Sequence, residues 1–144
     1  MILKKPEKIS NWALLTTGWG RNAKDTIQAY LDGNLKNSKI TLVIIIKNKM
    51  LKAFPNRIVN IHPSLLPSFS GTKMAIQEVL AYGVKITGIT THIIDDKLDE
   101  GMILCQKTIK VKPDDTFETL YSKFSKKGIT IILKTIKMME KRKI

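Results

Sequence analysis

Residues 60–67 read Asn-Ile-His-Pro-Ser-Leu-Leu-Pro and begin inside a short β-type run at 58–61. The stretch carries His62, one of only two histidines in the chain. Asn60 and His62 are two positions apart, so on a strand both side chains leave the same face. An imidazole beside a neutral amide suits general acid/base catalysis and oxyanion stabilisation. The competing interpretation is a structural histidine at a turn.

Two prolines mark where this strand ends. Pro63 and Pro67 prevent residues 64–68 from forming a regular helix or strand. The stretch is therefore expected to be a strand that runs into a constrained loop, with Asn60 and His62 at its end.

The residues before this stretch predict a strand–helix–strand unit. Residues 12–17 and 40–46 are apolar runs that indicate buried strands. Between them, Asn22 is expected to cap a helix that Gly33 ends. Such a unit pairs its strands in parallel with a right-handed crossover. The uninterrupted β-branched run at 40–46 indicates a strand covered on both faces, hence parallel and central.

Two helices and two strands are expected after residue 67. The first helix is capped by Thr72 and ended by Gly83, and strands follow at 84–95 and 102–111. A capping box of Asp115 and Glu118 opens a long C-terminal helix. The apolar stripe expected on the long helix is Phe117, Leu120, Tyr121, Phe124, Ile132, Ile136 and Met139. On strand 84–95, Thr90 and His92 share one face and Thr91 lies on the other.

A glycine-rich turn connects the first strand to the first helix. It consists of Gly18, Trp19, Gly20, Arg21 and Asn22. Glycines let the backbone approach an anion closely, and free N–H groups at a helix N-terminus favour negative charge. Arg21 adds a cation, so the turn is interpreted as a phosphate site. Gly-x-Gly turns also occur for purely steric reasons, and that alternative stays open.

Length and composition favour one domain over residues 1–144. No apolar run is long enough to cross a bilayer, and no signal peptide is expected at the N-terminus. The single cysteine, Cys105, excludes an internal disulfide and fits a reducing compartment. A cytoplasmic location is therefore expected. The acidic segment 95–101 lacks the spacing of an EF-hand, so no metal site is expected there.

The formal net charge of +13 has two interpretations. It could indicate a polyanionic partner, such as nucleic acid or a phosphorylated small molecule. The lysines are instead scattered, and aromatic residues are not interleaved with them as in a stacking platform. The charge is therefore interpreted as compositional, and nucleic acid is not expected as a partner.

The order of several motifs resembles the folate-dependent formyltransferases. The resemblance is dense from about residue 54 to 127 and thinner over 12–47. The motifs are Asn-Ile-His-Pro-Ser-Leu-Leu-Pro at 60–67, Gly71, Gly-Val-Lys-Ile-Thr-Gly at 83–88, Thr91-His92 and Leu-Asp-Glu-Gly at 98–101. The resemblance implies an α/β, three-layer Rossmann-like fold, with a mostly parallel sheet and helices on both faces.

The same resemblance implies an activity and roles for individual residues. The activity is transfer of a formyl group from 10-formyltetrahydrofolate to the amine of glycinamide ribonucleotide, in purine biosynthesis, without a metal. Asn60 would hold the formyl oxygen, His62 would act as acid/base, and Asp99 would orient His62 and help move the proton. The turn at 18–22 would bind the substrate phosphate. The positions beside the folate-side loop would be Thr90, His92, Asp95 and Leu98.

The chain departs from the family pattern at two places. It is several tens of residues shorter, and the loss is expected near residues 47–50, so one or more βα units would be missing. A homodimer is one way to complete such a sheet. Gly128 stands where an acidic residue that contacts the amine is expected. Two alternatives therefore remain open: formyl transfer to methionyl-tRNA, and a truncated, inactive remnant.

Overall fold

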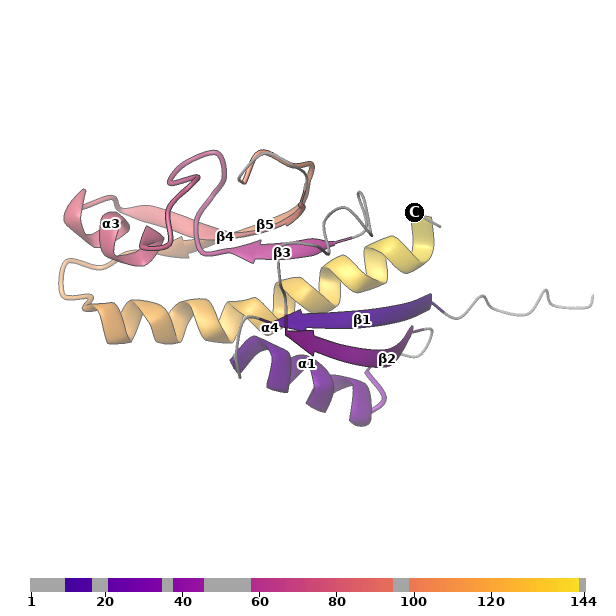
Figure 1. The fold of residues 1–144 in the computed structure, drawn as a ribbon. Helices are drawn as coiled ribbons and strands as arrows, with labels where there is room; N and C mark the ends of the chain where they lie inside the picture. Colours follow the sequence, from indigo (N-terminus) through magenta and orange to yellow (C-terminus); the bar gives the residue numbers. More distant parts are fainter. Residues whose placement is uncertain (1–9, 17–20, 35–37, 46–57, 95–98, 143–144) are drawn as a thin grey trace, which may run out of the picture. The chain divides into compact units, whose positions relative to one another are not determined.

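The computed structural model (Figure 1) describes residues 10–16, 21–34, 38–45, 58–94 and 99–142, and its elements follow the order β1, α1, β2, β3, α3, β4, β5, α4. The chain divides into two compact units. One comprises residues 1–46 and 136–144, and the other comprises residues 47–135. Asn60, His62, Thr90, His92 and Asp99 of the expected site belong to the second unit, and Arg21 and Asn22 belong to the first.

The first unit contains the predicted strand–helix–strand arrangement. Strand β1 (Ser10–Thr16) pairs in parallel with β2 (Ser38–Ile45), and helix α1 (Arg21–Leu31) lies between them in sequence. Gly33 follows the helix with a positive φ of 73°, as expected for a helix stop. Because α1 begins at Arg21, Asn22 lies inside its first turn, and the prediction that Asn22 precedes the helix as its cap is wrong.

The second unit is built on a three-stranded antiparallel sheet. Its strands are β3 (Val59–His62), β4 (Ile86–Ile93) and β5 (Ile103–Lys110), and β4 lies in the centre. A mostly parallel sheet is predicted from the sequence, but among the described strands only β1 and β2 pair in parallel. Nine residues separate β4 from β5, too few for the crossover that a parallel pair requires.

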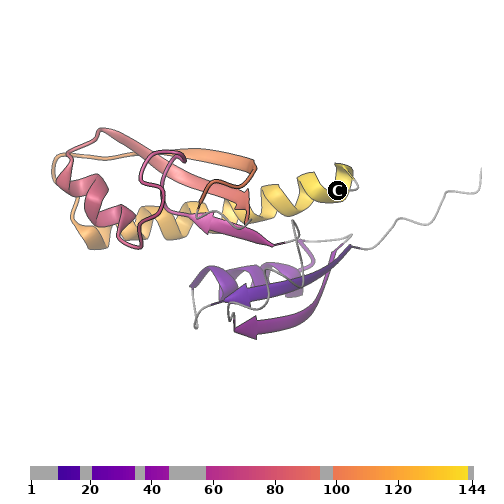
Figure 2. The same cartoon turned by 45° about the horizontal axis from the view of Figure 1, so that its top comes forward.

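Strand β4 is covered on both faces, and its side chains alternate as predicted. On one face Thr91 Oγ1 lies 2.7 Å from Thr135 Oγ1 of helix α4 (Phe117–Arg142), and both residues are buried. Figure 1 and Figure 2 show this part of α4 running along the sheet. On the other face, Thr90 contacts the segment 63–71, here called the proline turn. The centre of this unit therefore lies between α4 and the proline turn.

Gly88 on β4 has no room for a side chain. A Cβ there would lie 2.4 Å from Leu65 Cδ2 and 2.5 Å from the Lys107 carbonyl oxygen. The carbonyl belongs to the neighbouring strand β5, which cannot move without disturbing the pairing of the strands. Close packing of the proline turn on β4 therefore requires glycine at this position.

Replacing Gly88 by alanine is expected to lower the free energy of unfolding by about 1–3 kcal/mol, the usual cost of overpacking a core. Urea unfolding followed by circular dichroism measures the change. Gly83→Ala is the matched control, because Gly83 has a positive φ of 64° and nothing within 4 Å of its Cβ position. Its cost comes from backbone strain alone. Unchanged stability of Gly88→Ala would contradict the packing described here.

Helix α3 (Ala75–Ala81) begins later than predicted. Thr72 does not cap it. Instead, the Thr72 hydroxyl accepts a hydrogen bond from the Met74 N–H (3.0 Å) and donates one to Glu78 (2.6 Å). Gly83 follows the helix with a positive φ, as predicted. Thr72 therefore forms a turn before the helix, and Met74 occupies the cap position.

Helix α4 is continuous through Gly128, but its capping box lies one residue later than predicted. Thr116 Oγ1 accepts from the Thr119 N–H, and Thr119 Oγ1 accepts from the Thr116 N–H (2.9 Å). The predicted apolar stripe is confirmed in part, because Leu120, Phe124 and Ile136 are buried. Phe117 and Tyr121 are instead partly exposed and stack on each other.

Asp115 stabilises the start of α4 in a different way. Its carboxylate accepts the Lys112 N–H at 2.7 Å and forms an ion pair with Lys123. The hydrogen bond from the Lys112 backbone, followed by the contact with Lys123, lowers the pKa of Asp115 from 3.8 to about 2. A carboxylate with a lowered pKa in the folded state stabilises the fold above the unfolded-state pKa. That stabilisation is lost as the pH falls through the folded-state value.

Asp115→Asn is therefore expected to be less stable than the original chain at pH 6. The difference should shrink as the pH falls from about 4 to about 2, the window set by the two pKa values of Asp115. Thermal unfolding across this range measures it. Asp114→Asn, which removes the neighbouring exposed carboxylate, is the control. A difference that stays constant down to pH 2 would contradict the assigned contacts.

Candidate active site

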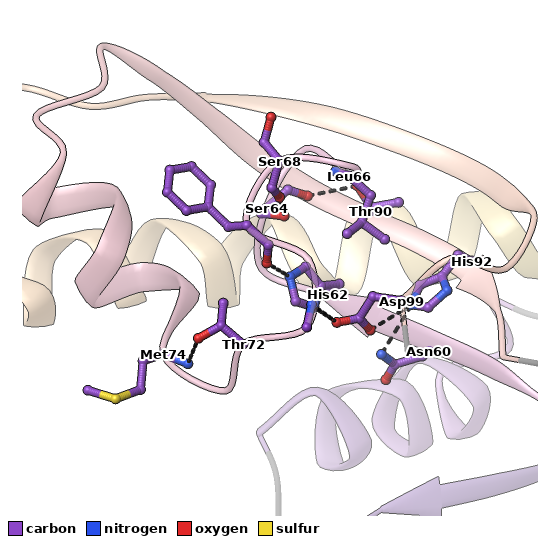
Figure 3. Close-up of polar contacts among 12 residues, drawn as sticks. Asn60, His62, Ser64, Leu66, Ser68, Thr72, Met74, Thr90, His92 and Asp99 are labelled. Carbon is purple, nitrogen blue, oxygen red and sulfur yellow. Dashed lines mark hydrogen bonds and ion pairs between the residues drawn. The ribbon is translucent and has the colours of Figure 1, made fainter. Parts of the chain in front are cut away.

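Asn60, His62 and Asp99, here called the polar trio, lie together at the end of strand β3 (Figure 3). Asn60 and His62 point from β3 toward the same cluster, as their spacing predicts. Asp99 comes from the segment between β4 and β5. The distance between His62 Nδ1 and Asp99 Oδ2 is 3.4 Å, and both side chains are more than nine-tenths buried.

The backbone fixes the position of Asp99. The residue has a positive φ of 58°, which is uncommon for a residue other than glycine. Its Oδ2 accepts a hydrogen bond from the Gly71 N–H at 3.0 Å, at the end of the proline turn. A contact across 28 positions of sequence thus holds the carboxylate against His62. A strained backbone that other contacts maintain is a common feature of functional sites.

Both ring nitrogens of His62 face oxygen atoms. Nε2 lies 2.8 Å from the carbonyl oxygen of Phe69, which can only accept, so Nε2 carries a proton. Nδ1 faces the Asp99 carboxylate, which is also an acceptor when ionised. Each ring nitrogen of His62 thus has an acceptor oxygen beside it. His62 is therefore arranged to donate a proton or a hydrogen bond.

The proline turn is held on β4 by a buried hydrogen-bond network. Thr90 Oγ1 donates to the Ser64 carbonyl at 2.7 Å and accepts from the Leu66 N–H at 3.1 Å. The Gln106 amide donates to the Leu66 carbonyl and to Thr90 Oγ1. Thr90 and Ser64 are completely buried. This network places the Phe69 carbonyl and the Gly71 N–H beside His62 and Asp99.

His92 joins the polar trio from the opposite strand. It pairs with Asn60 in the register of β3 and β4, and its Nε2 lies 3.2 Å from Asn60 Nδ2 and 3.6 Å from Asp99 Oδ1. Its Nδ1 lies 3.1 Å from the Ile93 carbonyl oxygen. The side chain is 1% exposed. The two histidines of the chain therefore lie on either side of one carboxylate.

The other expected site residues are only partly described. Gly18, Trp19, Gly20, Asp95 and Leu98 lie outside the described residues, while Arg21 and Asn22 form the start of α1 in the first unit. Phe69, Gly71 and Gln106 are contacts that the sequence analysis missed. Two of them act through backbone atoms, which leave no side-chain signal in a sequence. Gly71, with a φ of 74°, was noticed only as part of a motif.

None of the residues that the structure describes form a group of three or more His, Cys, Asp or Glu side chains that could hold a metal ion. No helix among them is long and apolar enough to span a membrane.

Comparison with known proteins identifies relatives of this chain. It is 42% identical over 82 residues to the phosphoribosylglycinamide formyltransferase of Bacillus subtilis, covering 57% of this chain and 42% of that protein. It is 43% identical over 97 residues to the methionyl-tRNA formyltransferase of Thermodesulfovibrio yellowstonii, covering 67% of this chain and 31% of that protein. The matching stretch thus spans less than half of either relative.

Solved structures and a family pattern agree with these relatives. The fold is similar to glycinamide ribonucleotide transformylase 1 from Symbiobacterium toebii, with a TM-score of 0.82 and 23% identity over 95% of this chain and 90% of that one. Phosphoribosylglycinamide formyltransferase from Bacillus halodurans gives a TM-score of 0.76 and 25% identity over 90% of this chain and 95% of that one. The pattern of the Formyl transferase family matches residues 41–136, two thirds of the sequence. The chain therefore belongs to the formyl transferase family.

Proposed function

We propose that this chain transfers a formyl group from 10-formyltetrahydrofolate to the amine of glycinamide ribonucleotide. The observation that carries the proposal is the contact geometry of the polar trio: a buried imidazole lies 3.4 Å from a buried carboxylate, and an amide from the same strand points toward the same cluster. Relatives named for this reaction, including the Bacillus subtilis protein, support the choice of acceptor.

The chemistry follows from what each side chain can donate or accept. The acceptor amine attacks the formyl carbon, and the carbonyl oxygen becomes an oxyanion. The Asn60 amide N–H and the His62 imidazolium N–H donate hydrogen bonds to that oxygen. Asp99 stabilises the imidazolium and helps carry the proton from the attacking amine to the folate nitrogen that leaves. These steps use only groups within the trio, and none requires a metal ion.

Further binding roles belong to the same proposal. The substrate phosphate is assigned to Gly18, Trp19, Gly20, Arg21 and Asn22, and the folate-side loop to Thr90, His92, Asp95 and Leu98. The glycine-rich turn before a helix supports the first assignment. The contact of His92 with Asn60 and Asp99 supports the second for that residue.

We also infer that residues 1–144 are one formyltransferase-like domain, with βα units missing from a mostly parallel sheet near residues 47–50. The 82 matched residues make up 42% of the Bacillus subtilis relative, so that protein has about 195 residues against 144 here. The parallel pair β1–β2 supports this architecture. The proposal also includes a homodimer that completes the sheet. It further includes a cytoplasmic location, with which the free Cys105 is consistent.

Methionyl-tRNA is the alternative acceptor. The Thermodesulfovibrio yellowstonii relative and the charge of +13 favour it, since tRNA is a polyanion. An inactive remnant is the third candidate, because the chain is short for this family and Gly128 replaces an expected acidic residue.

One assay separates the three candidates. The purified chain is given 10-formyltetrahydrofolate with glycinamide ribonucleotide or with charged initiator tRNA. Turnover with the ribonucleotide supports the proposal, and turnover with tRNA alone replaces it with the alternative. Absence of turnover with both, together with absence of folate-analogue binding by calorimetry, would leave only the inactive remnant.

A further inference from the structure

We propose that His92 is a positioning residue: as a neutral imidazole it accepts one N–H of Asn60 and thereby orients the amide toward the reacting oxygen. This inference rests on the formyl transfer proposed above. It concerns a residue that touches neither the formyl group nor the attacking amine in that scheme, and that acts through Asn60.

The first step is the tautomer of His92. Its Nδ1 lies 3.1 Å from the backbone carbonyl of Ile93. A carbonyl oxygen can only accept, so Nδ1 carries the proton. In a neutral imidazole the other nitrogen then has a free lone pair. With Nδ1 protonated and the ring neutral, as we propose, Nε2 is an acceptor.

The second step is the choice of partner for Nε2. Asn60 Nδ2 lies 3.2 Å away, within hydrogen-bond range, whereas Asp99 Oδ1 lies 3.6 Å away, beyond it. The Asn60 amide is thus the group that donates to His92.

The third step is the consequence for Asn60. A primary amide has two N–H donors on one nitrogen and an acceptor oxygen opposite. With one N–H bound to His92, the second remains on the same side of the amide and can donate to an oxyanion. A flipped amide would offer its oxygen there instead, and would repel the developing charge. His92 is 1% exposed and lies directly opposite Asn60 in the sheet, so the contact is rigidly placed.

The tautomer can be measured without any activity. Side-chain nitrogen NMR of the full chain, labelled at histidine, distinguishes protonated from unprotonated ring nitrogens. Near pH 7.5 we expect His92 to show a protonated Nδ1 and an unprotonated Nε2, assigned by comparison with His92→Gln. A protonated Nε2 would overturn the proposal. This result stands whether or not the formyl transfer is confirmed, so the two failures are distinguishable.

Kinetics test the effect on catalysis. His92→Met removes the acceptor while keeping an apolar side chain of similar size, and is expected to lower kcat at least about 10-fold with little change in KM for the folate. His92→Gln places an oxygen near the position of Nε2, and is expected to keep kcat within about threefold of the original. Equal loss in both variants would contradict the proposed role of the acceptor.

A double-mutant cycle separates positioning from a general structural effect. If His92 acts through Asn60, His92→Met should cost little more in an Asn60→Ala background, within about twofold. If the same factor is lost in both backgrounds, His92 does not act through Asn60 and the proposal is wrong. Circular dichroism of each variant confirms that the fold is retained.

Discussion

His62→Ala is expected to lower kcat for formyl transfer by about 100-fold or more, the usual contribution of a general acid or base. The imidazole is buried, its Nδ1 faces Asp99 and its Nε2 donates to the Phe69 carbonyl, so both ring nitrogens are held in place. Removing the ring removes a donor to the oxyanion and the route for the amine proton. Steady-state rates with 10-formyltetrahydrofolate and glycinamide ribonucleotide measure the loss.

The control for this variant is Lys73→Ala, which truncates an exposed side chain in the segment after the proline turn. It should retain the rate of the original chain. KM for the folate should change little in His62→Ala, because the proposed interaction is strongest in the transition state. Full activity of His62→Ala would refute the assignment of the acid/base.

Asn60→Ala is expected to lower kcat by about 10²–10³-fold, equivalent to about 3–4 kcal/mol of transition-state stabilisation. The reason is the loss of one of the two donors assigned to the oxyanion. Asn60→Asp keeps the shape of the side chain but replaces the N–H donor with a negative charge, and should be at least as impaired.

Comparing the two Asn60 variants separates shape from hydrogen bonding. If Asn60→Asp were fully active, the donor role of the amide would be wrong even though the residue lies in the site. Unfolding curves should show both variants folded, since Asn60 is half-buried and its side chain contacts His92.

Local structure could largely be predicted from the sequence. The two-residue spacing of Asn60 and His62, the alternation along β4 and the parallel pair β1–β2 all depend on short-range periodicity, and all are found. The capping of α4 could not be predicted to the residue, because Asp115 and Thr116 are both good N-cap residues. Only the contact of Asp115 with the Lys112 N–H decides between them.

Local sequence patterns carry too little information to predict how strands pair. An apolar run predicts a strand but not the direction of its neighbour, so the antiparallel sheet β3–β4–β5 was missed. The contact of His92 with Asn60 depends on that pairing and its register. The hydrogen bond from His62 to the Phe69 carbonyl and the one from the Gly71 N–H to Asp99 involve backbone atoms, which nearly every residue type could supply.

The Phe69 carbonyl has a consequence for selectivity between neutral and charged oxygens. This carbonyl already accepts a hydrogen bond from His62 Nε2 at 2.8 Å. Phe69 itself has a φ of 58°, which is uncommon for a residue other than glycine. A formyl oxygen in the ground state is also a neutral carbonyl oxygen. Exchanging the hydrogen bond of His62 from the Phe69 carbonyl to the formyl oxygen therefore gains little free energy. In the proposed reaction an oxyanion would be a much stronger acceptor and would displace the Phe69 carbonyl. His62 would then leave the Phe69 carbonyl only when negative charge has developed on the formyl oxygen.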